Sequence, residues 1–76
     1  MAINRDGADY LYVQLADDIR RRCRSREWAP DHRIPPITEL MAEYQLSDRT
    51  VRQAIGLLVD EGLLVTKPGR GTYVCP

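Results

Sequence analysis

Residues 47–71 have the sequence SDRTVRQAIGLLVDEGLLVTKPGRG, and this stretch decides the fold of the chain. Apolar residues recur in it at i, i+3, i+4 and i+7, the spacing of a buried helix stripe: Val51, Ala54, Ile55 and Leu58. By the same spacing the opposite face presents two guanidiniums and an amide without an acid, from Arg49, Arg52, Gln53 and Gly56. Arginine and glutamine on a helix can pair with base edges in the major groove of DNA. The pattern therefore predicts an amphipathic helix whose exposed face suits DNA.

A hairpin is predicted directly after this helix. Ser47 is a favourable N-cap and Gly62 suits a left-handed end, so the helix is expected to run from Ser47 to about Asp60. Residues 63–66 and 72–74 have strand character, and the residues between them are typical of a turn: Pro68, Gly69, Arg70 and Gly71.

Two further helices are predicted upstream. One runs from about Tyr10 to Ser25, with an apolar stripe of Tyr12, Leu15, Ala16, Ile19 and Cys23. The next is opened by Pro35 and Pro36, and its buried face consists of Ile37, Leu40, Met41 and Tyr44. Arg33 and Ile34 suit a short edge strand, and Trp28 is expected to fold back onto the core. We therefore predict a mainly α fold with a small β-hairpin, a winged helix-turn-helix over residues 10–76 after a loose arm at residues 1–9.

Composition excludes several classes of protein. A chain of 76 residues, 43% of them apolar, suits one small folded domain. It has no apolar run long enough for a membrane span and no apolar signal core at its N-terminus, so a cytoplasmic location is expected. Two cysteines and one histidine without metal-ligand spacing predict no metal site, no cofactor and free thiols. No catalytic motif is present, so an enzyme is not expected.

The charges are unevenly distributed although their formal sum is zero. Five basic residues crowd together as Arg20, Arg21, Arg22, Arg24 and Arg26. This cluster is either a phosphate-binding patch or a helix end where the dipole favours cations. Asp17 and Asp18 precede Arg21 and Arg22 by four residues, a spacing that predicts weak ion pairs. Tyr12, Trp28 and Tyr44 could stack on bases, but their apolar neighbours favour core packing.

Four segments resemble the DNA-binding domain of the GntR family of bacterial transcriptional regulators. They are residues 10–16 (YLYVQLA), 33–40 (RIPPITEL), 46–54 (LSDRTVRQA) and 62–74 (GLLVTKPGRGTYV). The resemblance implies that Ser47, Thr50 and Arg52 hold the DNA backbone and orient the third helix, and that the backbone of Gly69 enters the minor groove. Two arginines common in the family are replaced here by Thr38 and Asp48. The family's larger C-terminal effector and dimerisation domain has no counterpart in these 76 residues.

The predicted function is sequence-specific binding of double-stranded DNA by a bacterial transcriptional regulator, as a repressor, with helix 47–60 in the major groove and the wing 67–71 at the minor groove. The predicted DNA-binding residues are Ser47, Asp48, Arg49, Thr50, Arg52, Gln53, Lys67, Gly69, Arg70 and Gly71. Arg49 is expected to pair with guanine and Arg52 with a phosphate, while Asp48 either pairs with cytosine or disfavours family-type operators. An inverted-repeat operator and a monomer or weak dimer in free solution are expected. The alternative is a winged-helix module that binds protein and has weak or lost DNA binding.

Overall fold

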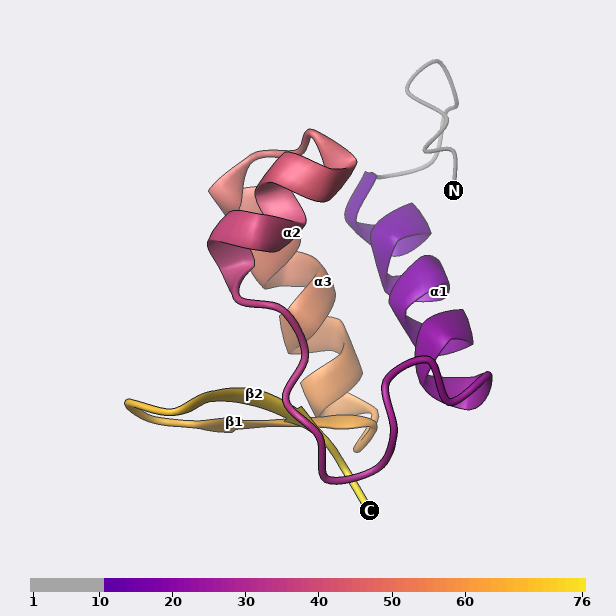
Figure 1. Ribbon diagram of the computed structural model, residues 1–76. Helices are drawn as coiled ribbons and strands as arrows, with labels where there is room; N and C mark the ends of the chain where they lie inside the picture. Colours follow the sequence, from indigo (N-terminus) through magenta and orange to yellow (C-terminus); the bar gives the residue numbers. More distant parts are fainter. Residues whose placement is uncertain (1–10) are drawn as a thin grey trace.

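The computed structural model of the protein describes residues 11–76, which form three helices and a hairpin (Figure 1). The elements are α1 (Leu11–Arg24), α2 (Ile37–Tyr44), α3 (Asp48–Asp60), β1 (Leu64–Lys67) and β2 (Gly71–Val74). This order confirms the predicted mainly α fold with a β-hairpin. The predicted arm at residues 1–9 and the predicted helix start at Tyr10 lie outside the described residues.

The core lies between α1 and α3, because the apolar stripes of these helices face each other. Leu15 and Ile19 of α1 and Val51 and Leu58 of α3 are each 0% exposed. Both predicted stripes are confirmed, with Tyr12 only partly buried at the margin of the core. Leu40 and Tyr44 attach α2 to the same cluster, and Trp28 folds back onto it as predicted. The exposed face of α3 is therefore the face opposite α1.

Both ends of α3 have the predicted caps. The Ser47 side chain accepts a hydrogen bond from the backbone N–H of Thr50 at 3.2 Å. At the other end Gly62 has a φ of +80°, a conformation that glycine adopts without the steric cost of a Cβ. Its N–H donates to the Val59 carbonyl and the next N–H, that of Leu63, donates to the Leu58 carbonyl, both at 3.0 Å. This pair of bonds is a Schellman motif, which turns the chain sharply into β1.

The hairpin pairs Leu64 with Val74 at one end and Lys67 with Gly71 at the other. β1 therefore begins and ends one residue later than predicted, and β2 begins one residue earlier, because the ladder extends to the base of the turn. The Arg70 N–H donates to the Lys67 carbonyl at 2.9 Å, and Gly69 has a φ of +75°. Proline followed by a glycine of positive φ matches a type II turn.

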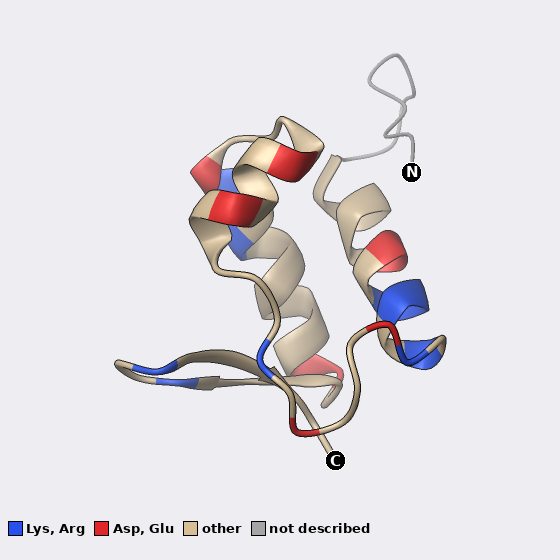
Figure 2. Ribbon diagram, viewed as in Figure 1, with Lys and Arg blue, Asp and Glu red and all other residues tan. Residues whose placement is uncertain are grey.

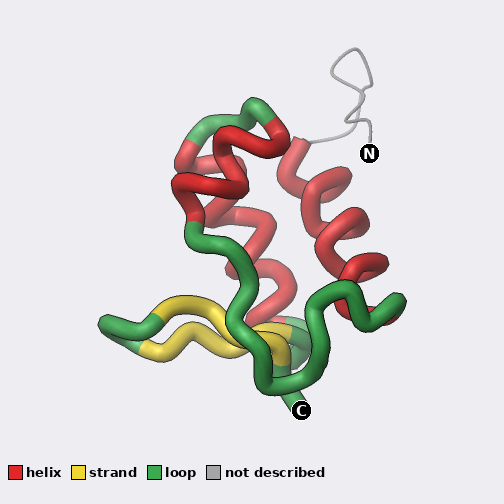
Figure 3. Tube along the Cα trace, viewed as in Figure 1, coloured by secondary structure: helices red, strands yellow, loops and turns green. Residues whose placement is uncertain are grey.

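Residues 32–34, in the loop before α2, run alongside β2 (Figure 3). Arg33 forms an antiparallel bridge with Tyr73, so the predicted edge strand is confirmed as a single bridge. The N–H of Ile34 donates to the Thr72 carbonyl at 2.9 Å, and the N–H of Val74 donates to the His32 carbonyl at 3.0 Å. The loop and the hairpin are therefore fastened together on both sides of Arg33.

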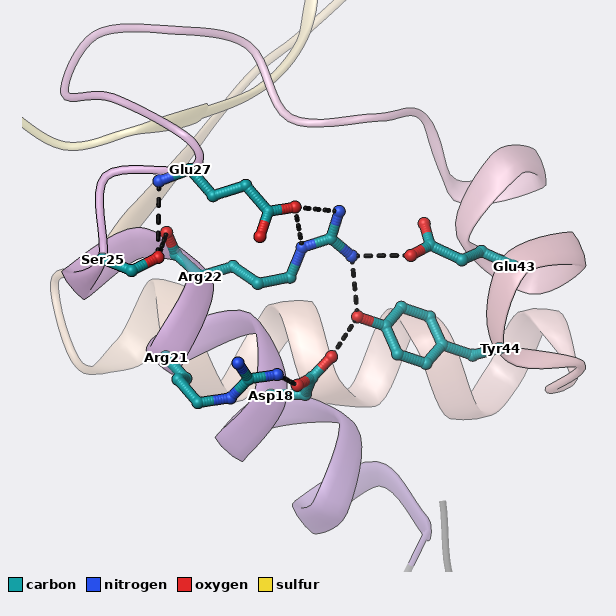
Figure 4. Close-up of polar contacts among 7 residues, drawn as sticks. All are labelled: Asp18, Arg21, Arg22, Ser25, Glu27, Glu43 and Tyr44. Atoms are coloured by element: carbon teal, nitrogen blue, oxygen red, sulfur yellow. Dashed lines mark hydrogen bonds and ion pairs between the residues drawn. The ribbon is translucent and has the colours of Figure 1, made fainter. Parts of the chain in front are cut away.

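A polar network joins α1 to the end of α2 (Figure 4). The Tyr44 hydroxyl donates to the carboxylate of Asp18, whose residue is only 1% exposed. The Arg22 guanidinium donates in turn to the Tyr44 oxygen and to the carboxylates of Glu43 and Glu27, each at 2.8 Å. Burial and the bond to Asp18 raise the pKa of Tyr44 to about 12. Buried polar groups are thus satisfied in a network that fixes the position of α2 relative to α1.

Ion pairs within the protein engage much of the arginine cluster. Arg20 pairs with Asp17 and with Glu61 after α3, and Arg21 pairs with Asp18. The predicted pairing of Asp17 and Asp18 four residues along the helix is wrong: each carboxylate pairs with the arginine three residues along, which lies equally close on a helix surface. Arg22 lies over the Trp28 ring, 4.0 Å from its centroid. Three of the five clustered arginines are therefore engaged within the protein.

Candidate nucleic-acid interface

The exposed face of α3 carries the side chains that the helical spacing predicts. Arg49, Arg52, Gln53 and Gly56 are all exposed, and Val51, Ala54, Ile55 and Leu58 are buried beneath them. Arg49 has no carboxylate partner among residues 11–76. Figure 2 shows basic positions on the first half of α3 and on the hairpin. The guanidinium of Arg49 is therefore available for a partner outside the chain.

Two hydroxyl groups lie together at the N-terminus of α3. The Ser47 hydroxyl donates to the Thr50 hydroxyl oxygen at 3.0 Å while it accepts the N-cap bond. Thr50 keeps its own hydroxyl proton for another acceptor. A helix N-terminus carries a partial positive charge and favours phosphate groups. In this arrangement Thr50 supplies the hydroxyl donor for the predicted phosphate contact, and Ser47, which donates its one hydroxyl proton to Thr50, orients that side chain.

Asp48 and Arg52 form an ion pair on the same surface. The Arg52 Nε donates to both carboxylate oxygens of Asp48, at 2.9 and 2.8 Å, and the two side chains are 52% and 64% exposed. The expectation that this face carries no acid is wrong, because Asp48 lies one helical turn before Arg52 and shares its side of α3. Among residues 11–76 no acceptor is bonded to the two Nη groups of Arg52, which leaves one edge of the guanidinium available.

The two strands of the hairpin lie beside α3. A hollow beside α3 is lined by Arg52, Gly56 and Asp60 from the helix and by Thr66 and Thr72 from the two strands. At the end of the hairpin Arg70 is exposed, and the Lys67 ammonium lies 4.6 Å from the centroid of the Tyr73 ring. The structure therefore places Arg52, one of the predicted site residues of α3, on a surface that continues onto the two strands of the hairpin.

One residue of this surface was not found from the sequence. Arg33 lies at the base of the hairpin, and its side chain crosses Gly71: a Cβ at that position would come within 2.6 Å of the Arg33 Nε. The lining of the neighbouring groove includes Arg33, Lys67 and Arg70. In the sequence Arg33 was only an edge-strand residue, and its position beside the wing depends on its pairing with Tyr73, far along the chain.

Other kinds of site have little support in the part of the chain that the structure describes. No group of three histidine, cysteine, aspartate or glutamate residues within 11–76 could hold a metal ion. Cys23 is buried as predicted, and it and Cys75 are free thiols. No helix within the same residues is long and apolar enough to cross a membrane.

Comparison with known proteins identifies the family of this chain. Residues 11–74 match the family described as bacterial regulatory proteins, gntR family, and the chain therefore belongs to the GntR family. Its fold is the winged helix-turn-helix of that family's DNA-binding domains. The chain is 39% identical to the DNA-binding domain of AraR crystallised with operator ORR3, over 84% of this chain and 77% of that one, with a TM-score of 0.82. It is 31% identical to YtrA from Sulfolobus acidocaldarius, a GntR-family transcription factor, over 99% of this chain and 79% of that one, with a TM-score of 0.89.

Curated relatives are longer than this chain. The chain is 36% identical to the HTH-type transcriptional repressor NagR of Bacillus subtilis, over 97% of its own length and 30% of the repressor. It is 43% identical to the arabinose metabolism transcriptional repressor of Geobacillus stearothermophilus, over 83% of its own length and 17% of that protein. The similarity therefore covers less than a third of each repressor.

Proposed function

We propose that this chain is the DNA-binding part of a bacterial transcriptional repressor and that it binds a specific sequence in double-stranded DNA. The observation that carries the proposal is the position of Arg49, unpaired within residues 11–76, on an exposed helix face beside a basic hairpin. The AraR domain, bound to its operator in the crystal, has the same fold and 39% identity. Proteins of this class act by binding, so the proposal includes no catalytic step, and a cytoplasmic location goes with it.

The exposed residues of α3 have different roles in this proposal. Arg49 and Gln53 meet base edges in the major groove, with Arg49 at a guanine. Thr50 and Arg52 hold phosphates with donors at or near the N-terminal turn of α3, and Ser47 takes part by donating its hydroxyl proton to Thr50 and so orienting that side chain. Asp48 has a third role besides pairing with cytosine or disfavouring other operators: it orients Arg52 through Nε.

The wing meets the minor groove in the same proposal. Gly69 and Gly71 lack side chains at the turn and so permit close approach of the backbone. Lys67 and Arg70 supply positive charge, which narrow A·T-rich minor grooves attract most strongly. We therefore propose a preference for A·T-rich sequence beside the base pairs that α3 contacts.

Assembly on DNA completes the proposal. The apolar stripes of α1 and α3 are buried against each other, so neither stripe is available to form a dimer interface. We propose a monomer or weak dimer in free solution and two copies on an inverted repeat. Sedimentation velocity at low micromolar concentration should give a monomer, and a tight dimer without DNA would contradict this part of the proposal.

A protein-binding module is the second candidate function. A formal net charge of zero, the pairing of Arg52 with Asp48, and Thr38 in place of a family arginine all favour it. Binding-site selection on random duplexes, followed by titrations at several salt concentrations, separates the two. DNA binding must weaken by about 0.9 log units per log unit of salt for each phosphate neutralised. Selection that enriches no sequence, with no salt-dependent binding, would leave the protein-binding module.

A further inference from the structure

The loop before α2 is built into the base of the wing. The N–H of Ile34 donates to the Thr72 carbonyl at 2.9 Å, and the His32 carbonyl accepts from the N–H of Val74 at 3.0 Å. Between these two bonds, Arg33 forms the antiparallel bridge with Tyr73. The backbone of Arg33 is therefore fixed relative to the hairpin, although the residue belongs to neither strand of it. A side chain on a fixed backbone is restricted to fewer positions than one on a mobile loop.

The side chain of Arg33 lies across the one residue of β2 that has no side chain. A Cβ at Gly71 would meet Nε of Arg33 at 2.6 Å, Cζ at 3.2 Å and Nη2 at 3.3 Å. The guanidinium thus occupies the space that any other residue at position 71 would fill. No carboxylate among residues 11–76 is paired with Arg33, whereas Arg20, Arg21, Arg22 and Arg52 are all paired.

A groove runs from this guanidinium between the hairpin and the helices. It is lined by residues 35–38, which lead into the start of α2, by Ile55 of α3 and by residues 66–72 of the hairpin. Its charged lining residues are Arg33, Lys67 and Arg70, and no aspartate or glutamate lines it. In a chain whose formal charges cancel, a groove with three cations and no acid is the feature that suits a polyanion.

The geometry of duplex DNA indicates what this groove holds. The major and minor grooves of B-DNA are separated by a single sugar-phosphate backbone. If α3 enters the major groove and the wing meets the adjacent minor groove, that backbone must cross the space between them. We propose that the Arg33 guanidinium, which lies against Gly71 of the wing, binds a phosphate of this intervening backbone, an inference that rests on the proposed DNA-binding function.

Arg26 supplies a matched control for the experiment. It is exposed, lies in the turn after α1, has no carboxylate partner within residues 11–76 and lines none of the grooves beside the wing. Arg33→Ala and Arg26→Ala therefore remove the same charge from two different surfaces. Arg33→Lys keeps the charge and serves as the conservative variant. Circular dichroism checks that each variant is folded before its binding is measured.

The experiment measures affinity for the selected operator as a function of salt. Arg33→Ala should reduce the salt slope by about 0.9 and lower the affinity at 0.1 M salt roughly eightfold, with the same preferred sequence. Arg26→Ala should leave the slope unchanged, and Arg33→Lys should restore most of it. An Arg33→Ala slope equal to that of the unmodified protein would overturn the inference.

Neutral phosphates identify the contact directly. Methylphosphonate groups are placed one at a time along the backbone between the major-groove and minor-groove contacts. One of them should weaken binding of the unmodified protein and have no effect on Arg33→Ala. If every substitution weakens both proteins equally, the inference is wrong while the proposed function stands. If the unmodified protein selects no DNA sequence, the proposed function itself fails.

Discussion

Both carboxylate oxygens of Asp48 accept hydrogen bonds from the Nε of Arg52, at 2.9 and 2.8 Å, on the exposed face of α3. The pair joins residues four apart with the acid nearer the N-terminus, the favourable orientation on a helix. Exposed pairs of this kind stabilise a fold by only about 0.3–0.5 kcal/mol. The main consequence of the pair is therefore for recognition: it lowers the net charge of the face and fixes one edge of a guanidinium.

Asp48→Asn tests this consequence. It removes one negative charge and frees Arg52, so affinity for non-specific duplex should rise and selectivity for the operator should fall. Asp60→Asn removes the same charge from the last turn of the same helix, and Asp60 forms no ion pair with Arg52 among residues 11–76. Operator and random-duplex affinities measured by fluorescence anisotropy compare the two variants. Equal effects of both variants would mean that Asp48 acts only through its charge. An unchanged selectivity ratio would mean that Asp48 serves only the stability of α3, as an acid at the helix N-terminus.

The wing contact is tested by Arg70→Ala. The side chain is exposed and lies next to Gly69 and Gly71 at the tip, so its loss should not disturb the core. We expect the salt slope of DNA binding to fall by about 1, the value for one phosphate contact, and the preference for A·T-rich flanks to weaken. Hydroxyl-radical footprinting should also lose protection in the minor groove beside the site. Protection confined to the base pairs under α3 in the unmodified protein would count against the wing contact.

The network around Tyr44 governs stability at high pH. The pKa of Tyr44 is raised from 10.0 to about 12, because burial and the bond to Asp18 favour the protonated hydroxyl. This stabilisation is therefore complete below pH 10 and is lost as the pH rises toward 12. Tyr44→Phe should cost about 1–3 kcal/mol at neutral pH, since it removes a bond to a buried carboxylate.

The same variant should also show a smaller loss of stability between pH 10 and pH 12. Urea unfolding at several pH values measures both effects, and Tyr73→Phe on the wing is the control. An equal alkaline loss in Tyr44→Phe and the unmodified protein would mean that Tyr44 is not the group responsible.

Local patterns predicted most of this fold because each depends on a short stretch of chain. The spacing of Leu15 and Ile19, the N-cap at Ser47 and the left-handed Gly62 are all set by neighbours within a turn or two. The strand ends were misplaced by one residue because ladder length depends on cross-strand pairing. The pairing of Asp17 and Asp18 was wrong because side chains three and four residues along a helix are both within reach.

The remaining features arise from contacts between distant segments. Arg33 reaches Gly71 only because the loop before α2 pairs with β2, and Tyr44 meets Asp18 only because α2 packs beside α1. The ion pair of Asp48 with Arg52 is different, since its spacing was visible in the sequence. The helical spacing of Arg49, Arg52, Gln53 and Gly56 does not include Asp48, which is the first residue of α3 and lies one turn before Arg52.

The most direct test of DNA recognition by α3 is binding-site selection with the unmodified protein and Arg49→Ala. Arg49 is exposed and unpaired within residues 11–76, so its replacement should leave the fold intact. We predict a loss of about 1–3 kcal/mol in operator affinity and relaxed preference at one base pair, where the unmodified protein selects guanine. Arg52→Ala should weaken all sequences about equally. An Arg49→Ala protein that selects the same motif with the same affinity would contradict the placement of α3 in the major groove.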